Sequence, residues 1–300
     1  MKPRTYTTPA AFKAALDQRL RNVAEPGIGI TRRRQLLVFD RYLARLVRVL
    51  GDAATLKGGL VLELRLDRAR TTRDIDLRLI GSPEDLLARL QGAGRLDLGD
   101  FMSFEVSVDA RHPDIAGAGV QSDGQRFRAE CRLAGMLYGQ AFGVDVAFGD
   151  PILGEAEVIT GDDLLAFAGI AAPELRVYPV ETHVAEKLHA YTLPRATPNT
   201  RVKDLPDLAL LGQTGPRDAR RLRAALAQTF GFRATHPVPP RVPDPPVVWK
   251  EPYAAIAEED ALPWATLGEV LAAAREFIDP VLSSDIDGSW DPGTWTWDLT

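Results

Sequence analysis

The chain of 300 residues has almost no cysteine. A single residue, Cys131, excludes an intramolecular disulfide framework and a zinc site built from several cysteines. Free thiols of this kind are usual in a reducing compartment. We therefore expect a cytoplasmic protein.

Long hydrophobic runs are also lacking. The amino-terminal segment, MKPRTYTTPAAFKAAL, has no apolar stretch of the kind found in secretory signals, and no later run reaches the length of a membrane-spanning helix. We expect no association with a membrane. Because 45% of the residues are hydrophobic, the chain can still bury a sizeable core, as a soluble globular protein does.

Acidic residues are scarce at the amino end and basic residues are scarce at the carboxyl end. Residues 1–50 carry eleven Arg or Lys against three Asp or Glu, and residues 251–300 carry one Arg against eleven Asp or Glu. The basic end could meet a phosphate backbone. A solvated helix turn explains the same charges, and charge alone favours that explanation.

The hydrophobic pattern predicts two domains, 1–155 and 156–300. The first is predicted to be α/β (α+β), a mixed sheet flanked by helices. Its alternating apolar residues predict strands over 74–80, 101–109, 126–133 and 137–148.

The second predicted domain is mostly helical, beginning with a helix over 161–170. Seven prolines in the segment 235–253 exclude regular helix or sheet there and predict an extended connector. Trp249 and Tyr253 could anchor this connector to the body of the protein.

The stretch LKGGLVLELRLDRARTTRDIDLRL, residues 56–79, places two acids on either side of one isoleucine. Alternate residues of a strand point to the same face, so Asp74 and Asp76 are predicted to project side by side while Ile75 enters the core. Adjacent carboxylates repel one another unless a cation lies between them, and Mg²⁺ prefers oxygen ligands. Asp145 lies in a strand with the same alternation and could add a third carboxylate for phosphoryl or nucleotidyl transfer.

The motif KGG precedes these acids and a short predicted helix. Glycines let the backbone approach an anion, N–H groups at a helix start can cradle phosphate, and Lys57 could neutralise a triphosphate. A plain strand-to-helix turn with surface acids at a strand end is the alternative. The ordered set of KGG, RTTRDID and a later VDV strand favours a nucleotide site.

These segments carry a resemblance to a known family. KGGLVLELRL and RTTRDIDLRL resemble the nucleotidyltransferase signature of the AbiEii/AbiGii-type (MenT-like) toxins, members of the DNA polymerase β nucleotidyltransferase superfamily. VETHVAEKLHAY, RVKDLPDLALL and VDVAFGDPI are similar to further blocks of that family and follow in the same order.

The resemblance implies a role for each matching position, with Gly59 standing where the superfamily often has serine. The implied metal ligands are Asp74, Asp76 and Asp145. The implied catalytic residues are Asp74, Asp76, Lys187 and Asp204, the last orienting Lys187 or the acceptor hydroxyl. The implied nucleotide-binding residues are Lys57, Gly58, Gly59, Arg201 and Lys203.

The family also implies an activity. It is a Mg²⁺-dependent transfer of a nucleoside monophosphate from an NTP to an RNA, the tRNA 3′ end, which blocks translation and is countered by a cognate antitoxin. One alternative is the same chemistry on a protein or small-molecule acceptor. Another is a non-catalytic NTP- or RNA-binding regulator on the same fold. His183 and His189 lie six residues apart, a poor spacing for helical ligands, and are expected to be structural or peripheral.

Overall fold

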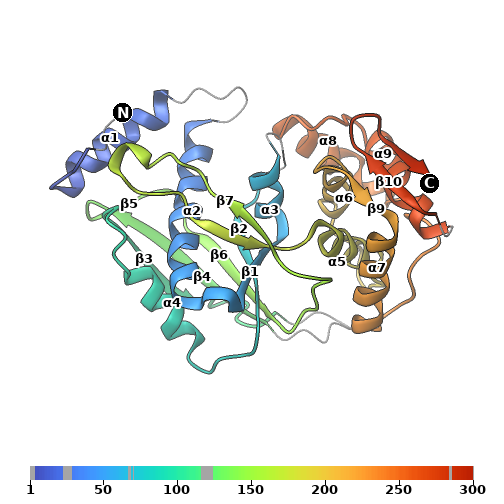
Figure 1. Cartoon of the computed structure of the whole chain (residues 1–300), viewed down its shortest axis with the longest axis horizontal. Coiled ribbons are helices and arrows are strands. Elements are labelled where there is room, and N and C mark those ends of the chain that lie inside the picture. The colour runs from blue at the N-terminus through green and yellow to red at the C-terminus, as the bar shows by residue number, and fades with distance from the viewer. Residues whose placement is uncertain are drawn as a thin grey trace.

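The computed structural model describes residues 4–22, 29–66, 69, 71–115, 124–283 and 286–299. Two lobes lie side by side, a sheet lobe with the amino end and a helical lobe with the carboxyl end (Figure 1). Each lobe has its own cluster of buried hydrophobic side chains. The predicted α/β class is confirmed.

The described part of the sheet lobe contains an eight-stranded mixed sheet in the order β3-β4-β6-β2-β1-β8-β7, with β5 paired to β4. Its strands are β1 (Ala54–Lys57), β2 (Asp74–Leu79), β3 (Met102–Val108), β4 (Gly124–Leu133), β5 (Met136–Leu137), β6 (Phe142–Phe148), β7 (Glu157–Thr160) and β8 (Glu174–Val177). The central strand β2 pairs antiparallel with β1 and parallel with β6.

Helices cover one face of this sheet. The helices of the lobe are α1 (Pro9–Asn22), α2 (Ile30–Leu50), α3 (Gly58–Arg65) and α4 (Leu86–Arg95). Apolar residues of α2 and α4 share one buried cluster with Ile75 and Leu77 of β2. Since successive residues of a strand alternate between faces, the acids of β2 point to the opposite face.

The predicted strand over 137–148 is interrupted in the structure. The segment splits into β5 and β6, separated by a turn in which Gly139 has a φ of +79°. A side chain there would also meet Gln35 Oε1 at 2.9 Å. The alternation of apolar residues marked β6 correctly but gave no sign of the turn before it.

The predicted helix over 161–170 is wrong. This segment forms only a 3-10 turn at Ala166–Ala168, which ends at Gly169 with a φ of +75°. Leu164, Leu165 and Phe167 are buried against the core of the sheet lobe. Their apolar character therefore reflects a buried loop and not the face of a helix.

The sheet continues beyond residue 155. β7 and β8 form an antiparallel pair, and β8 pairs in parallel with the central strand β1. The domain division at residue 155 stays a prediction, but the sheet reaches Val177 before the helical lobe begins.

The helical lobe contains α5 (Val180–Thr192), α6 (Asp204–Gly212), α7 (Ala219–Arg233), α8 (Lys250–Glu259) and α9 (Leu267–Ser283). It also contains a three-stranded sheet of β9 (Arg217–Asp218), β10 (Gly288–Asp291) and β11 (Thr296–Leu299). The proline-rich connector ends earlier than predicted, because a 3-10 turn begins at Val247 and α8 follows with Pro252 in its first turn. Trp249 and Tyr253 are both buried.

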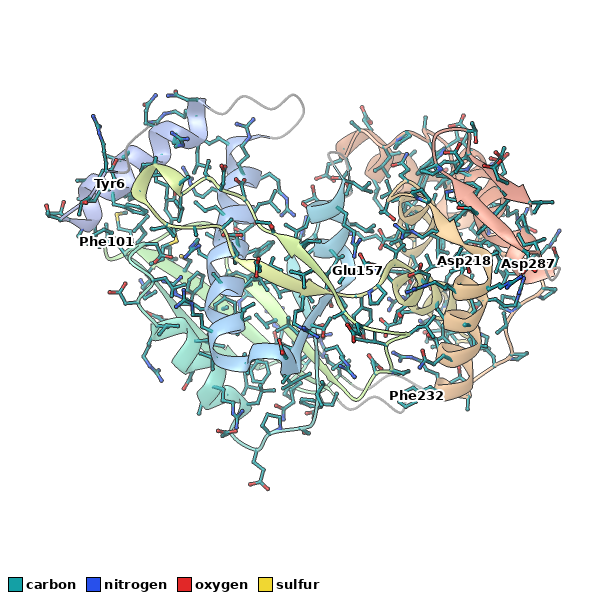
Figure 2. All side chains as sticks on the ribbon, viewed as in Figure 1. Tyr6, Phe101, Glu157, Asp218, Phe232 and Asp287 are labelled. Carbon is teal, nitrogen blue, oxygen red and sulfur yellow. The ribbon has the colours of Figure 1, made fainter. Side chains whose placement is uncertain are left out.

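Contacts join the lobes beside α3. Glu157 lies between them (Figure 2), and its carboxylate is 2.8 Å from the Arg65 guanidinium of α3. The same carboxylate accepts a hydrogen bond from the backbone N–H of Val180, where α5 begins, at 3.3 Å. Among the described residues, no helix is long and apolar enough to cross a membrane.

Candidate functional site

The acids of β2 lie on the open face of the sheet. Asp74 and Asp76 flank Ile75, which is fully buried on the other side. In the register of the sheet, Asp145 of β6 is opposite Asp76 on one side and Lys57 of β1 is opposite Asp76 on the other. Paired positions share a face, so three carboxylates and a lysine gather there.

Two glycines leave room for these carboxylates. Gly58, where β1 turns into α3, has a φ of +72°, and a Cβ there would lie 2.0 Å from Asp76 Oδ2. Gly143 of β6 donates its N–H to Asp74 Oδ1 at 3.1 Å, and a Cβ there would lie 2.6 Å from that oxygen. The predicted loop residue Gly59 follows Gly58 and is buried in the first turn of α3.

Asp145 is engaged by an arginine. Nε and Nη2 of Arg126, on β4, donate to its two oxygens at 2.8 Å each. In the ranges that the structure describes, no group of three or more His, Cys, Asp and Glu residues is arranged to hold a metal ion. Asp74 and Asp76 make no ion pair with any described residue, whereas both oxygens of Asp145 are already occupied.

Burial raises the pKa of Asp76 to about 6, and the neighbouring charge of Asp145 adds to this effect. Lys187 and Lys57 lower the pKa but do not cancel the rise. The site is therefore short of positive charge beside Asp76. Two adjacent carboxylates in this state suit a hard divalent cation, so the donor set fits the implied Mg²⁺ at Asp74 and Asp76.

Lys57 belongs to an ion cluster that joins the two lobes. Its Nζ lies 2.7 Å from Asp150 Oδ2 and 3.1 Å from Glu186 Oε2. Arg233, the last residue of α7, reaches the same two carboxylates at 2.9 and 3.4 Å. Burial by itself lowers the pKa of Lys57, but Glu186, Tyr178 and Asp150 outweigh burial and the pKa is raised. Lys57 is thus a permanent cation beside Gly58.

The helical lobe contributes a second held cation. Nζ of Lys187, on α5, lies 3.2 Å from Asp204 Oδ1 and 2.7 Å from Asp207 Oδ2. Arg201 also pairs with Asp204 through its Nε. Asp204 is the first residue of α6 and follows Lys203, a position where the helix dipole favours an acid. The structure thus places Asp204 beside Lys187.

The two histidines of α5 differ in their surroundings. Burial, with the charge of Lys187, lowers the pKa of His183 to about 3, so its ring is neutral at physiological pH. Its buried Nε2 has no hydrogen-bond partner in the described residues. His189 lies 2.8 Å from Thr235 Oγ1, and burial lowers its pKa to about 4.

One cavity of about 680 Å³ collects these groups, a volume typical of ligand sites. All ten residues that the sequence singled out line this cavity: Lys57, Gly58, Gly59, Asp74, Asp76, Asp145, Lys187, Arg201, Lys203 and Asp204. Both histidines line it as well.

Six further charged residues line the cavity without having been predicted as site residues: Arg73, Arg126, Asp150, Glu186, Arg195 and Arg233. Arg73, Asp150 and Glu186 fall inside blocks that carry the family resemblance, so their positions held a usable signal. Arg126 and Arg233 lie among other arginines of a strand and a helix, and nothing local distinguishes them.

Residues 41–287 match the family model described as "Nucleotidyl transferase AbiEii toxin, Type IV TA system". No curated protein sequence matches the chain.

Among solved structures, MenT4, a nucleotidyltransferase toxin from Mycobacterium tuberculosis H37Rv, is similar with a TM-score of 0.55 and 17% sequence identity. The match covers 94% of this chain and 92% of that one. JHP933 from Helicobacter pylori matches with a TM-score of 0.46 and 13% identity over 84% of this chain and 93% of its own. The likeness to MenT4 supports the fold.

Proposed function

Because the chain belongs to the AbiEii family of nucleotidyltransferase toxins from type IV toxin–antitoxin systems, we propose that it transfers a nucleoside monophosphate from an NTP to the 3′ end of an RNA. The expected RNA is tRNA, whose modified end would no longer support translation. The observation that carries this proposal is the cavity between the lobes. It brings the carboxylates of Asp74 and Asp76 together with the cations Lys57 and Lys187.

The cations would bind the triphosphate. Lys57 lies next to the amino end of α3, where backbone N–H groups favour an anion. Lys187 faces the same cavity from the other lobe. Carboxylates hold each lysine in place, Asp150 and Glu186 for Lys57 and the acids of α6 for Lys187. An NTP bound across the cavity would thus be held by both lobes.

Asp74 and Asp76 would hold a divalent cation, which when bound neutralises charge on the phosphoryl group being transferred. The acceptor hydroxyl releases its proton to water, and its oxygen forms a bond to the α-phosphorus while the bond from that phosphorus to pyrophosphate breaks. In such a reaction the attacking hydroxyl oxygen, the phosphorus and the leaving oxygen of pyrophosphate lie roughly in line. Arg126 keeps the third carboxylate, Asp145, fixed beside Asp76 and offers positive charge to an incoming acceptor.

The proposal also names partners and a location. The type IV system to which the family belongs pairs a toxin with a cognate antitoxin. Both NTP and tRNA are cytoplasmic, so the proposed reaction takes place in the cytoplasm.

A direct test uses purified protein, Mg²⁺, total tRNA and each α-³²P-labelled NTP in turn, followed by a denaturing gel. Asp74→Ala is the control, because it removes one carboxylate of the proposed metal pair. Label on tRNA with the wild type alone is the expected result, and it would also identify the nucleotide. Label on another molecule would move the acceptor to a protein or small molecule. No transfer with any NTP and acceptor would contradict the activity.

A further inference from the structure

A second cavity of about 570 Å³ adjoins the first. The two share Thr72 and Arg73, which directly precede Asp74. The second cavity lies among the start of α2, the end of α3, the end of α8 and the residues before β6. Its volume is within the range of ligand sites. It therefore opens at the amino end of the strand that carries the two catalytic acids.

The residues that lead into β2 and β6 connect the first cavity with the second. Asp74 is opposite Gly143 and Asp76 is opposite Asp145 in the register. Thr72 and Ala141, which line the second cavity, lie two residues before Asp74 and Gly143 and precede the two strands. Two residues of extended chain span about 6.6 Å. An extended ligand could thus lie along these residues with one end in each cavity.

Hydrogen bonds fix the wall of the second cavity. Arg32 of α2 pairs with Glu63 of α3, and its Nη1 donates to the carbonyl of Thr72 at 2.7 Å. The Gln35 amide donates to the carbonyl of Gln140 at 3.2 Å and accepts from its N–H at 2.7 Å. These contacts hold α2, α3 and the residues before β6 together, so the cavity is formed before a ligand arrives.

The charged residues around the second cavity indicate which part of a ligand each would contact. Arg73 stands at the junction of the cavities, is exposed, and makes no hydrogen bond or ion pair with a described residue. A guanidinium in that position suits a phosphate. Glu259 and Asp260 line the second cavity itself, together with Leu36 and Leu66. These carboxylates would repel a phosphate. Together with the apolar side chains, they can surround an uncharged base.

The geometry of the reaction indicates that the ligand of the second cavity is the acceptor and not the NTP. Lys57, beside Asp76, and Lys187 line the first cavity and not the second. Pyrophosphate should leave toward these cations. The attacking hydroxyl must approach from the opposite side of the phosphorus, and the second cavity opens beside Asp74.

We infer that Arg73 and the second cavity form an acceptor subsite for single-stranded RNA. The cavity takes the base that precedes the 3′-terminal nucleotide, and Arg73 takes the phosphate that links the two. Unstacked bases at RNA ends are recognised in this way. The inference rests on the proposed function and adds a requirement: the acceptor must have an unpaired 3′ end.

The test measures KM for RNA and KM for NTP separately, with a 5′-labelled RNA duplex that has either a single-stranded 3′ tail or a blunt end. Arg73→Gln removes the exposed cation, and Ala141→Glu places a larger side chain with a carboxylate in the second cavity. Arg48→Gln and Ala172→Glu make the same changes at a third cavity, between α2 and the segment before β8. Because Arg73 is exposed, its variant should fold even if Ala141→Glu does not.

Wild type is expected to extend the tailed RNA and not the blunt one. Each subsite variant should raise KM for the tailed RNA about tenfold or more, the effect of losing contacts to one base or phosphate. KM for NTP should stay unchanged, and the variants at the third cavity should match wild type. A rise in KM for NTP instead would place the nucleotide in the second cavity and overturn the inference.

Two further results would also overturn it. Unchanged KM for RNA in Arg73→Gln would show that the subsite lies elsewhere, and equal use of blunt RNA would remove the need for an unpaired end. Both leave the proposed function standing, since RNA is still labelled. If wild type labels no RNA, the proposed function itself fails and the inference with it.

Discussion

Replacing Gly58 with alanine tests whether catalysis needs Asp76 where the structure places it. The φ of Gly58 is +72°, a conformation that costs an L-residue about 1–2 kcal/mol. The new Cβ would also lie 2.0 Å from Oδ2, 2.6 Å from Cγ and 2.8 Å from Cβ of Asp76. Because the contact reaches the Cβ of Asp76, rotating its carboxylate cannot relieve the clash and the side chain must shift.

Gly99 provides the matched control. Its φ is +73°, but a Cβ there would have no other atom within 4 Å. Gly99→Ala should therefore lower the free energy of unfolding by about 1–2 kcal/mol and leave transfer unchanged. Gly58→Ala should lower it by at least as much and reduce transfer about 100-fold, the scale of effect expected when a reacting group moves by about 1 Å.

Urea unfolding gives the free energies, and transfer of α-³²P-labelled nucleotide under Mg²⁺ gives the rates. Wild-type transfer by a folded Gly58→Ala protein would refute the requirement for Asp76 at this position. An equal loss of transfer in both variants would assign the effect to backbone strain and not to the contact with Asp76.

Three other changes have expected outcomes. Asp74→Ala should abolish transfer at little cost in the free energy of unfolding, because among the described residues its carboxylate accepts only the hydrogen bond from Gly143. Transfer assays and urea unfolding measure the two effects, and retained activity would show that the site is misplaced. Asp40→Asn should stabilise the protein increasingly from pH 4 to pH 8, because burial raises the pKa of Asp40 from 3.8 to about 7 and its ionisation in this range favours the unfolded chain by up to about 4 kcal/mol. A difference in unfolding free energy between variant and wild type that does not change with pH would contradict this. Asp100→Ala should cost about 3–5 kcal/mol, because it leaves Arg41 and Arg45 buried without their shared carboxylate; a loss below about 1 kcal/mol by urea unfolding would show that the arginines find other partners.

Local patterns were sufficient for several elements. Alternation in DIDLRL predicted β2 and the face of its acids, and helical spacing predicted α5 and α6. The same reasoning failed at 161–170, where buried apolar residues form a loop. The spacing of apolar residues indicates which residues are buried, and a short buried loop can have the same pattern of apolar residues as part of a helix.

The sequence by itself determined which residues could serve a nucleotide site, since KGG, DID, EKLHA and RVKD are each contiguous. Only the tertiary structure decided what they touch. Arg126 and Asp145 are 19 residues apart and Lys57 and Asp150 are 93 apart, yet each pair is in hydrogen-bond contact. Strand register and the packing of one lobe against the other create these contacts, and neither leaves a local pattern in the chain. The engagement of Asp145 by Arg126 and the second cavity beside Asp74 could therefore be seen only once the chain was folded.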